Sequence, residues 1–332
     1  MLCVLEGFKK ENVLRPVENL ASKLETCAAL SLFLIFGVFF TSMFVTNDVS
    51  LIIFVPLTIL LFRSGEKEKY ILPVISMENI AAIRGSLLTP FGSPQNLFLY
   101  GQAKEIGFAH FMFHMSPLSV MSAVLLIIFV FVLYRRNPKE RIIFTHERKE
   151  WGKDRRFQRI TYILLFVLVM TVIVTRTQLY WVALIVVITA ILIADRKIFL
   201  RVDYVLILTF LCFFVFSSSV TANEKISSFL SGCVAGREYW WAIGLSQIIS
   251  NVPASIVLFP FSNNFGGLIY GADTAGLCSL IGSLASVINY RIYVREYPGN
   301  GKKFIKTFTL VSWAFFAIVV IPGYLLSKWK FL

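Results

Sequence analysis

Two short stretches of this 332-residue chain carry the same polar residues at the same spacing inside apolar sequence. The first begins at Thr46 and reads TNDVSLIIFVP, and the second begins at Ser250 and reads SNVPASIVLFP. Each stretch lies between two apolar segments, so each predicts a hairpin with a polar tip. The residue after such a tip starts a half-helix, whose first N–H groups lack internal partners and whose dipole favours negative charge. A tip of this kind is able to bind an anion.

A second pair of motifs follows the hairpins, namely TPFGSPQN from Thr89 and SLIGSLAS from Ser279. Both carry a hydroxyl, two further residues and then Gly-Ser, within an otherwise apolar span. Gly and Pro at these places predict a helix that breaks into two halves. Broken backbone within a bilayer is tolerated only where it is buried in protein or lines an aqueous cavity, so each break predicts a polar site.

The candidate site residues come from these tips and breaks. One alternative is that their hydroxyl and amide side chains merely cap the half-helices that follow, as Ser, Thr, Asn and Asp commonly do. Capping alone does not require a break within a membrane, so we favour substrate binding for the set. The substrate-binding candidates are Thr46, Asn47, Ser86, Thr89, Gly92, Ser93, Asn96, Ser250, Asn251, Ser279, Gly282 and Ser283.

Charged residues near the motifs add candidates for a coupling ion. Asp48 is the one acidic residue in the two tip stretches. Its negative charge would be costly within the membrane unless a proton, a cation or an Arg neutralised it. We therefore predict that Asp48, with Asn47 and Asn251, binds the coupling ion. Arg84 is expected either to meet the substrate anion or to pair with Asp48 or Glu78.

The composition places these motifs in a bilayer. Hydrophobic residues make up 57% of the chain and charged residues 15%, which is more apolar than the surface of a soluble domain allows. The net charge of +13 resides largely in loops between apolar spans, which indicates membrane orientation and not nucleic-acid binding. The five cysteines lack metal-ligand spacing, and no hydrolase, phosphate-loop or metalloprotease motif occurs. We expect an all-α polytopic membrane protein that is not an enzyme and holds no metal.

The apolar spans divide into two repeats around a basic loop. The first repeat covers 1–134, the loop 135–159 and the second repeat 160–332. The first contains an interfacial helix over 8–26, a hairpin over about 30–62, a broken helix over about 70–100 and a span over about 111–134. The second contains three scaffold spans near 160–175, 179–194 and 203–219, a hairpin over about 238–262, a broken helix over about 271–290 and a final span over about 305–327.

Basic residues predict how the repeats are oriented. The loop at 135–159 holds ten Lys or Arg against four acidic residues, which predicts a cytoplasmic position. Counting spans from this loop places the N-terminus in the cytoplasm and the C-terminus outside. Separately, we expect Asp273, beside Gly271 and Thr274, to lie at the outer mouth. By the same count of spans, the first hairpin opens to the cytoplasm and the second to the outside. Inverted repeats with paired broken helices indicate the central binding site of a secondary transporter.

At the tip and break motifs the chain resembles the ion transporter superfamily, which includes citrate transporter-like permeases and arsenite efflux permeases. Asp48 after Asn47, and Pro253 after Asn251, are similar to the arsenite and citrate-permease branches. The resemblance implies re-entrant hairpins and secondary active transport of a small anion, a carboxylate or an oxyanion, by alternating access in the cell membrane. It also implies Na⁺ or H⁺ as coupling ion, no other cofactor, and membrane lipid, a small anionic substrate and a second copy in a homodimer as partners.

The scaffold departs from the pattern of the superfamily. Three predicted spans precede the second hairpin, whereas none precedes the first. By symmetry, the chain is expected to lack N-terminal scaffold helices. An alternative function follows from this departure, namely a truncated, non-transporting paralogue that acts as a membrane partner or sensor subunit.

Overall fold

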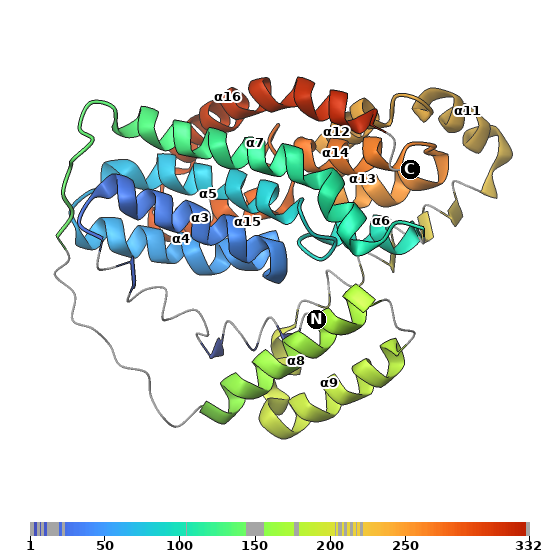
Figure 1. The fold of residues 1–332 in the computed structure, drawn as a ribbon, viewed down its shortest axis with the longest axis horizontal. Helices are drawn as coiled ribbons and strands as arrows, with labels where there is room; N and C mark the ends of the chain where they lie inside the picture. The colour runs from blue at the N-terminus through green and yellow to red at the C-terminus, as the bar shows by residue number, and fades with distance from the viewer. Residues whose placement is uncertain are drawn as a thin grey trace. The chain divides into compact units, whose positions relative to one another are not determined.

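The computed structural model shows an all-α protein with several apolar helices, which confirms the predicted fold class of a polytopic membrane protein (Figure 1). Within the part of the chain that the structure describes, no strand is formed, and Thr26 and Arg141 make an isolated bridge. The structure describes residues 24–103, 105–143, 156–175, 179–202 and 222–329, with isolated positions before 24 and between 204 and 219.

The chain divides into two compact units, and each unit combines segments from both predicted repeats. Unit 1 combines Met1–Lys23 with Thr145–Leu208, and unit 2 combines Leu24–Phe144 with Thr209–Leu332. Both hairpins and both broken helices belong to unit 2, whereas unit 1 holds scaffold helices. The repeat boundaries stay a prediction. The described elements of unit 1 include α8 (Arg156–Thr175), α9 (Tyr180–Asp195) and the short η3 (Arg196–Arg201).

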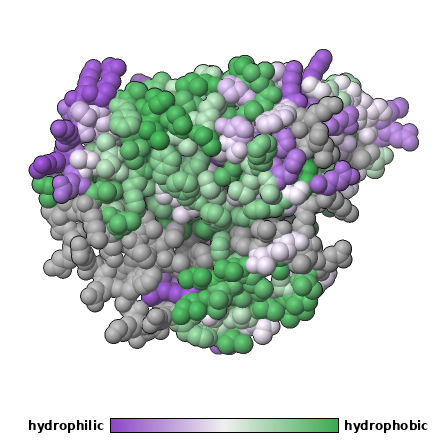
Figure 2. All heavy atoms as spheres, in the orientation of Figure 1, coloured by the Kyte–Doolittle hydropathy of each residue, from purple (hydrophilic) through white to green (hydrophobic). Residues whose placement is uncertain are grey.

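Four described helices, all in unit 2, are long and apolar enough to cross a membrane: α3 (Cys27–Val45), α4 (Asn47–Ser64), α7 (Phe108–Tyr134) and α16 (Gly301–Ser327). At about 1.5 Å per residue, α7 and α16 each extend about 40 Å, more than the roughly 30 Å hydrocarbon core. Large apolar side chains are exposed along both helices, and Figure 2 shows apolar residues across this part of unit 2 with hydrophilic residues gathered at its ends. Such a surface is suited to lipid.

The first hairpin consists of α3 and α4, joined through Thr46 alone. α3 begins before, and α4 ends after, the predicted hairpin bounds of about 30–62. Thr26 starts α3 earlier, because its hydroxyl accepts a hydrogen bond from the Ala29 N–H (3.3 Å), and polar residues extend the far end of α4. Since each helix is long enough to span a membrane, the re-entrant course of this hairpin stays a prediction.

The second hairpin consists of α12 (Glu238–Ile249) and α13 (Asn251–Leu258), joined through Ser250 alone, and the short η4 (Phe259–Phe261) continues it. Its bounds agree with the predicted 238–262. Helices of 12 and 8 residues extend only about 18 and 12 Å, so neither crosses a bilayer by itself. This length suits a re-entrant course, which here too stays a prediction.

Two long helices of unit 2 are interrupted where the Gly-Ser motifs lie. Pro and Gly disfavour a continuous helix there, and Pro94 occupies the first helical position, where a missing N–H costs nothing. The halves are α5 (Ile71–Ser86) with α6 (Pro94–Gln102), and α14 (Phe265–Ala275) with α15 (Leu284–Glu296). We call residues 87–93 and 276–283 the breaks, and Thr46 and Ser250 the tips.

The two halves of unit 2 exchange helices. Within each half, both arms of the hairpin pack on the first half of the broken helix, α3 and α4 on α5, and α12 and α13 on α14. Across the halves, α4 contacts α15 and α13 contacts α6. The second arm of each hairpin therefore lies against the broken helix of the other half, which brings all four half-helices that follow a tip or a break into one assembly.

Outside the hairpins and broken helices, the structure shows a helix that the sequence analysis did not predict, and two predicted segments lie largely beyond the described residues. The sequence analysis did not predict α11 (Glu224–Val234), whose run of small and polar residues gives a weak apolar signal. The third scaffold span, 203–219, and the interfacial helix, 8–26, lie largely outside the described residues. A short helix, η1 (Glu68–Tyr70), leads into α5.

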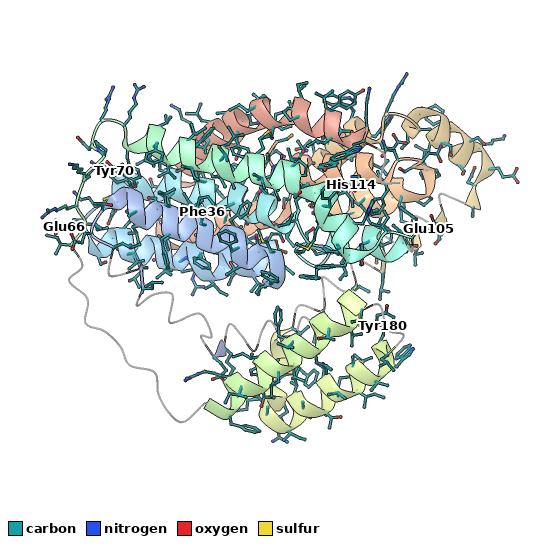
Figure 3. The ribbon with its side chains drawn as sticks, viewed as in Figure 1. Phe36, Glu66, Tyr70, Glu105, His114 and Tyr180 are labelled. Atoms are coloured by element: carbon teal, nitrogen blue, oxygen red, sulfur yellow. The ribbon has the colours of Figure 1, made fainter. Side chains whose placement is uncertain are left out.

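Polar contacts gather several helix ends at one end of unit 2. Glu140, beyond α7, pairs with Lys67 (2.9 Å) and accepts a hydrogen bond from Tyr70, which Figure 3 shows at this end. Arg63, near the end of α4, pairs with Glu296 at the end of α15 (3.2 Å). The predicted orientation requires these segments to share one side of the membrane, and the contacts agree with it. Which side they occupy stays a prediction.

Candidate functional site

Both tips adopt the same unusual backbone conformation. Thr46 has φ 82° and ψ 151°, and Ser250 has φ 70° and ψ 159°. Positive φ is uncommon for residues other than glycine, and for a β-branched residue such as Thr46 it costs roughly 1–3 kcal/mol. A single residue that reverses the chain between two packed helices imposes this conformation. Strain of this kind is typical of functional sites.

Each tip is tied to the break of its own half by one backbone hydrogen bond. The Asn47 N–H donates to the Gly92 carbonyl (3.1 Å), and the Asn251 N–H donates to the Gly282 carbonyl (3.2 Å). Both glycines lie so close to the preceding half-helix that a Cβ at either position would overlap its backbone, at Ser86 for Gly92. The two halves therefore build the same junction from matching residues.

Four half-helices begin at these junctions, and each follows a hydroxyl residue. α4, α6, α13 and α15 start after Thr46, Ser93, Ser250 and Ser283, and none of these four side chains makes a capping hydrogen bond to its helix. In contrast, the Asn264 side chain does cap α14, by accepting from the Gly267 N–H (2.9 Å). The alternative that the four hydroxyls merely cap their own helices is thus wrong for this structure.

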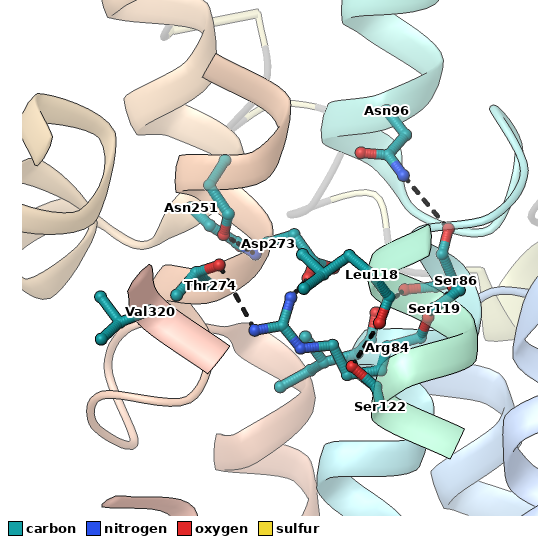
Figure 4. A network of polar contacts seen from close by, with 12 residues as sticks. Arg84, Ser86, Asn96, Leu118, Ser119, Ser122, Asn251, Asp273, Thr274 and Val320 are labelled. Carbon is teal, nitrogen blue, oxygen red and sulfur yellow. Dashed lines mark hydrogen bonds and ion pairs between the residues drawn. The ribbon is translucent and has the colours of Figure 1, made fainter. Parts of the chain in front are cut away.

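The start of α6 carries buried polar atoms that lack partners. Ser93 Oγ, Gln95 Oε1 and Asn96 Oδ1 make no hydrogen bond to the described residues. The other end of the Asn96 amide donates to the Ser86 carbonyl (3.1 Å), which fixes its position beside the break (Figure 4). Leaving a buried polar atom unsatisfied costs roughly 1–3 kcal/mol each, a cost that a bound ion or substrate would offset.

Three predicted site hydroxyls instead bond to the protein. Ser86 Oγ donates to the Ile83 carbonyl (2.9 Å), and Thr89 Oγ1 donates to the Met43 carbonyl, which holds the first break against α3. Ser279 Oγ bonds to Gln247 Oε1 (2.7 Å). These contacts position the breaks.

The second half uses two amides that reach the backbone of α14. Gln247 Nε2 donates to the Ala275 carbonyl (3.2 Å), and Asn251 Nδ2 donates to the Ala272 carbonyl (3.3 Å). The sequence analysis missed Gln247, although an amide inside the apolar α12 was a usable signal. Asn251 thus links the second tip to α14 through Ala272 and to the second break through Gly282.

Asp48 lies in the first turn of α4 and is half-buried. Its N–H donates to Asn47 Oδ1 (2.9 Å). An acid in a first helical turn is stabilised by the helix dipole, typically by 0.3–1 kcal/mol. The helix dipole therefore offsets part of the free-energy cost of placing the charged Asp48 carboxylate within the membrane.

Arg84 pairs with neither of its predicted partners, Asp48 or Glu78. Its guanidinium forms an ion pair with Asp273 and donates to Thr274 Oγ1 (3.3 Å), both on α14 (Figure 4). Asp273 is 1% exposed and lies inside unit 2, so its predicted place at an outer mouth is wrong. The pair joins the first halves of the two broken helices, which are 189 residues apart in sequence at this contact.

The comparisons with known proteins identify the family and relatives of this chain. A sequence model of the family described as citrate transporter matches residues 1–266. An uncharacterized transporter of Methanocaldococcus jannaschii is 32% identical over 299 residues, which cover 89% of this chain and 79% of that protein. The inner membrane protein YbiR of Escherichia coli is 29% identical over 305 residues, which cover 90% of this chain and 77% of that protein.

Proposed function

Because the chain belongs to the citrate transporter family, and is therefore a membrane transporter and not an enzyme, we propose that it carries small carboxylates or oxyanions by secondary active transport. Na⁺ or H⁺ is the coupling ion in this proposal. The substrate binds where the two tips meet the two breaks, and alternating access exposes that site to each face of the membrane in turn.

One observation carries the proposal: four half-helix starts, each preceded by a hydroxyl that makes no capping bond. The N–H groups of Asn47, Asp48 and Asn251 are already bonded within the protein, so the partial positive charge of the four helix starts is what favours an anion at this place. Hydroxyls add donors that orient the anion. Three side-chain oxygens at the start of α6 that lack partners among the described residues, those of Ser93, Gln95 and Asn96, supply further polar atoms for a ligand.

The division of the chain supports the mechanism of alternating access. Tips and breaks belong to one compact unit, and scaffold helices α8 and α9 belong to the other. Transport by this mechanism requires a site-bearing body that moves against a second body. In the proposal, unit 2 carries the substrate.

Uptake into proteoliposomes tests the proposal, with radiolabelled citrate, succinate and arsenite as separate probes. Asn47→Ala, Asn251→Ala and Ser93→Ala should each reduce uptake of the transported probe. Ser116→Ala is the matched control, because that hydroxyl bonds to its own helix at the Phe113 carbonyl (2.8 Å). Equal flux for wild type and all variants would remove the tips and breaks from the mechanism, and no flux of any probe in wild type would reject the substrate class.

We also propose that the N-terminus lies in the cytoplasm and the C-terminus outside. In a variant without native cysteines, Glu66→Cys should react with an impermeant maleimide only from the cytoplasmic side. Lys328→Cys should react only from the outside. Labelling of both from the same side would contradict this orientation.

A further inference from the structure

A second buried carboxyl lies in unit 2, away from the Arg84–Asp273 pair. Glu78, in the middle of α5, has no exposed surface. Its Oε1 accepts a hydrogen bond from the Thr58 hydroxyl on α4, and its Oε2 has no hydrogen-bond partner among the described residues. This carboxyl therefore bridges the second arm of the first hairpin to the first half of the first broken helix.

No cation neutralises this carboxyl within the described part of unit 2. Among the described residues of unit 2, the buried basic side chain is that of Arg84, and it is paired with Asp273. An ionised carboxylate without a partner is strongly disfavoured in a protein interior and in a bilayer. Glu78 is therefore neutral in this conformation, and its carboxyl holds a proton.

The helices that pack on α5 place their charged groups away from this position. They are α3, α4, α7, α15 and α16. No charged residue occurs in α3, and those of the others lie toward helix ends or on exposed surface. Their charged and titratable groups are Cys27 in α3; Asp48 and Arg63 in α4; His110, His114 and Tyr134 in α7; Tyr290, Arg291, Tyr293, Arg295 and Glu296 in α15; and Lys302, Lys303, Lys306 and Tyr324 in α16.

Two buried amides lie where α5 meets α15, and one of them, Asn79, follows Glu78 directly in the chain. Asn79 Nδ2 donates to Ser286 Oγ (3.1 Å), and Asn289 Nδ2 donates to the Ile75 carbonyl (2.7 Å). The oxygens of both amides lack partners among the described residues. These unpaired oxygens would accept hydrogen bonds from water that reaches Glu78, which gives a proton a polar route to the carboxyl.

Packing of the fold does not require an acid here. Gly92 in the first half matches Gly282 in the second. The residue the same number of positions after Glu78 is Leu268, a buried apolar residue of α14. The second half therefore builds its broken helix with an aliphatic side chain at the matching place. The carboxyl is a feature of the first half alone.

We propose that Glu78 is the proton-binding residue that couples transport to a proton gradient. The inference rests on the proposed function and names H⁺ as its coupling ion. Water on one face of the membrane protonates the carboxylate, and the proton leaves to water on the other face, so that one O–H bond forms and breaks in each cycle. The neutral carboxyl lets α4 and α5 pack together, whereas its ionised form favours a conformation in which water enters between them.

The test compares two transport modes in proteoliposomes, with radiolabelled citrate and any other probe that the wild type transports. Glu78→Gln keeps the size and neutral character of the protonated residue but binds no proton. We expect this variant to retain substrate exchange at equal pH on both sides and to lose accumulation driven by a proton gradient, down to the level of protein-free liposomes. Glu78→Asp should recover part of that accumulation, and Glu105→Gln, a change at an exposed carboxyl, should match wild type.

Distinct results overturn the inference and the proposed function. Proton-driven accumulation that persists in Glu78→Gln overturns the inference, and so does accumulation driven by Na⁺ alone. Absence of transport of every probe in wild type overturns the proposed function instead. Infrared spectra of the purified protein then decide the inference separately: a protonated-carboxyl band at neutral pH that disappears in Glu78→Gln supports it, and the lack of such a band overturns it.

Discussion

Arg84 of α5 and Asp273 of α14 form an ion pair in the buried interior of unit 2. Each residue belongs to the first half of a broken helix, so the pair fixes the two halves of the site relative to each other. The Ser119 hydroxyl also donates to the Arg84 carbonyl (2.8 Å), which adds α7 to this network. Since its guanidinium is bonded within the protein, Arg84 acts here as a positioning residue.

Breaking this pair from one side should destabilise the fold more than removing it altogether. Arg84→Ala leaves a buried carboxylate unpaired, and a loss of about 3–5 kcal/mol is typical for such a change. The double variant Arg84→Ala, Asp273→Ala leaves no uncompensated charge and should recover part of this loss. Thermal unfolding in detergent measures both. If the double variant is less stable than wild type by the sum of the two single-variant losses, the two residues do not interact.

Substitution of the break glycines should separate each tip from its break. Gly92→Ala and Gly282→Ala place a Cβ against backbone atoms, which cannot move without shifting the half-helix, so we expect a loss of about 1–3 kcal/mol and reduced uptake. Gly101→Ala is the control, because a Cβ there meets open space at the end of α6. Uptake and unfolding temperature equal to the control would contradict the close approach.

Relief of strain at the second tip should raise stability and lower transport together. Ser250→Gly removes the cost of a positive φ, which we expect to stabilise the protein by about 1 kcal/mol, and it removes a hydroxyl from the site. Ser283→Gly serves as control, because its backbone is extended (φ −147°) and glycine relieves nothing there. The measurements are unfolding temperature and uptake. A less stable Ser250→Gly would show that the tip stores no strain.

Stability in acid should depend on the contacts at one end of unit 2. The hydrogen bond from Tyr70, together with Lys67 and Lys69, lowers the pKa of Glu140 to about 2, from an ordinary 4.5. A lowered pKa in the folded state means that the stabilisation is complete above about pH 4.5 and is lost as the pH falls toward 2. At pH 7, Glu140→Gln should be less stable by about 1–2 kcal/mol after allowance for solvent screening.

Unfolding temperatures of wild type and Glu140→Gln across this pH range check the expectation. The difference between them should shrink in acid, because protonation of Glu140 makes the wild type resemble the variant. A difference that stays constant from pH 7 to pH 3 would contradict the assigned contacts.

Local patterns in the sequence predicted the helices and hairpins well. Pro, Gly and hydroxyl residues inside apolar runs located both tips and both breaks, because these residues disfavour helix wherever they occur together. The ends of α3 and α4 were placed too close to the tips. Apolarity indicates where lipid or core contacts a helix, whereas caps such as Thr26 decide where the helix begins.

The contacts that join the two halves were beyond reach of these patterns. Arg84 was recognised as unusual, but Asp273 became its partner only through the tertiary structure that brings the Arg84 side chain to α14, which no local spacing encodes. Gln247 differs, because an amide inside the apolar α12 was a usable signal, but its partner, the Ala275 carbonyl on α14, becomes evident only from the packing within the second half. The roles of individual side chains thus required tertiary structure.

The exchange of helices in unit 2 has a consequence for biogenesis and motion. Since α4 rests on α15, and α13 on α6, neither half can complete its own surroundings during synthesis, and α4 must wait for residues more than two hundred positions downstream. A chain cut between the halves would have to reassociate before any transport began. Once assembled, each hairpin is supported by broken helices of both halves, so we expect displacement of one tip to disturb the support of the other.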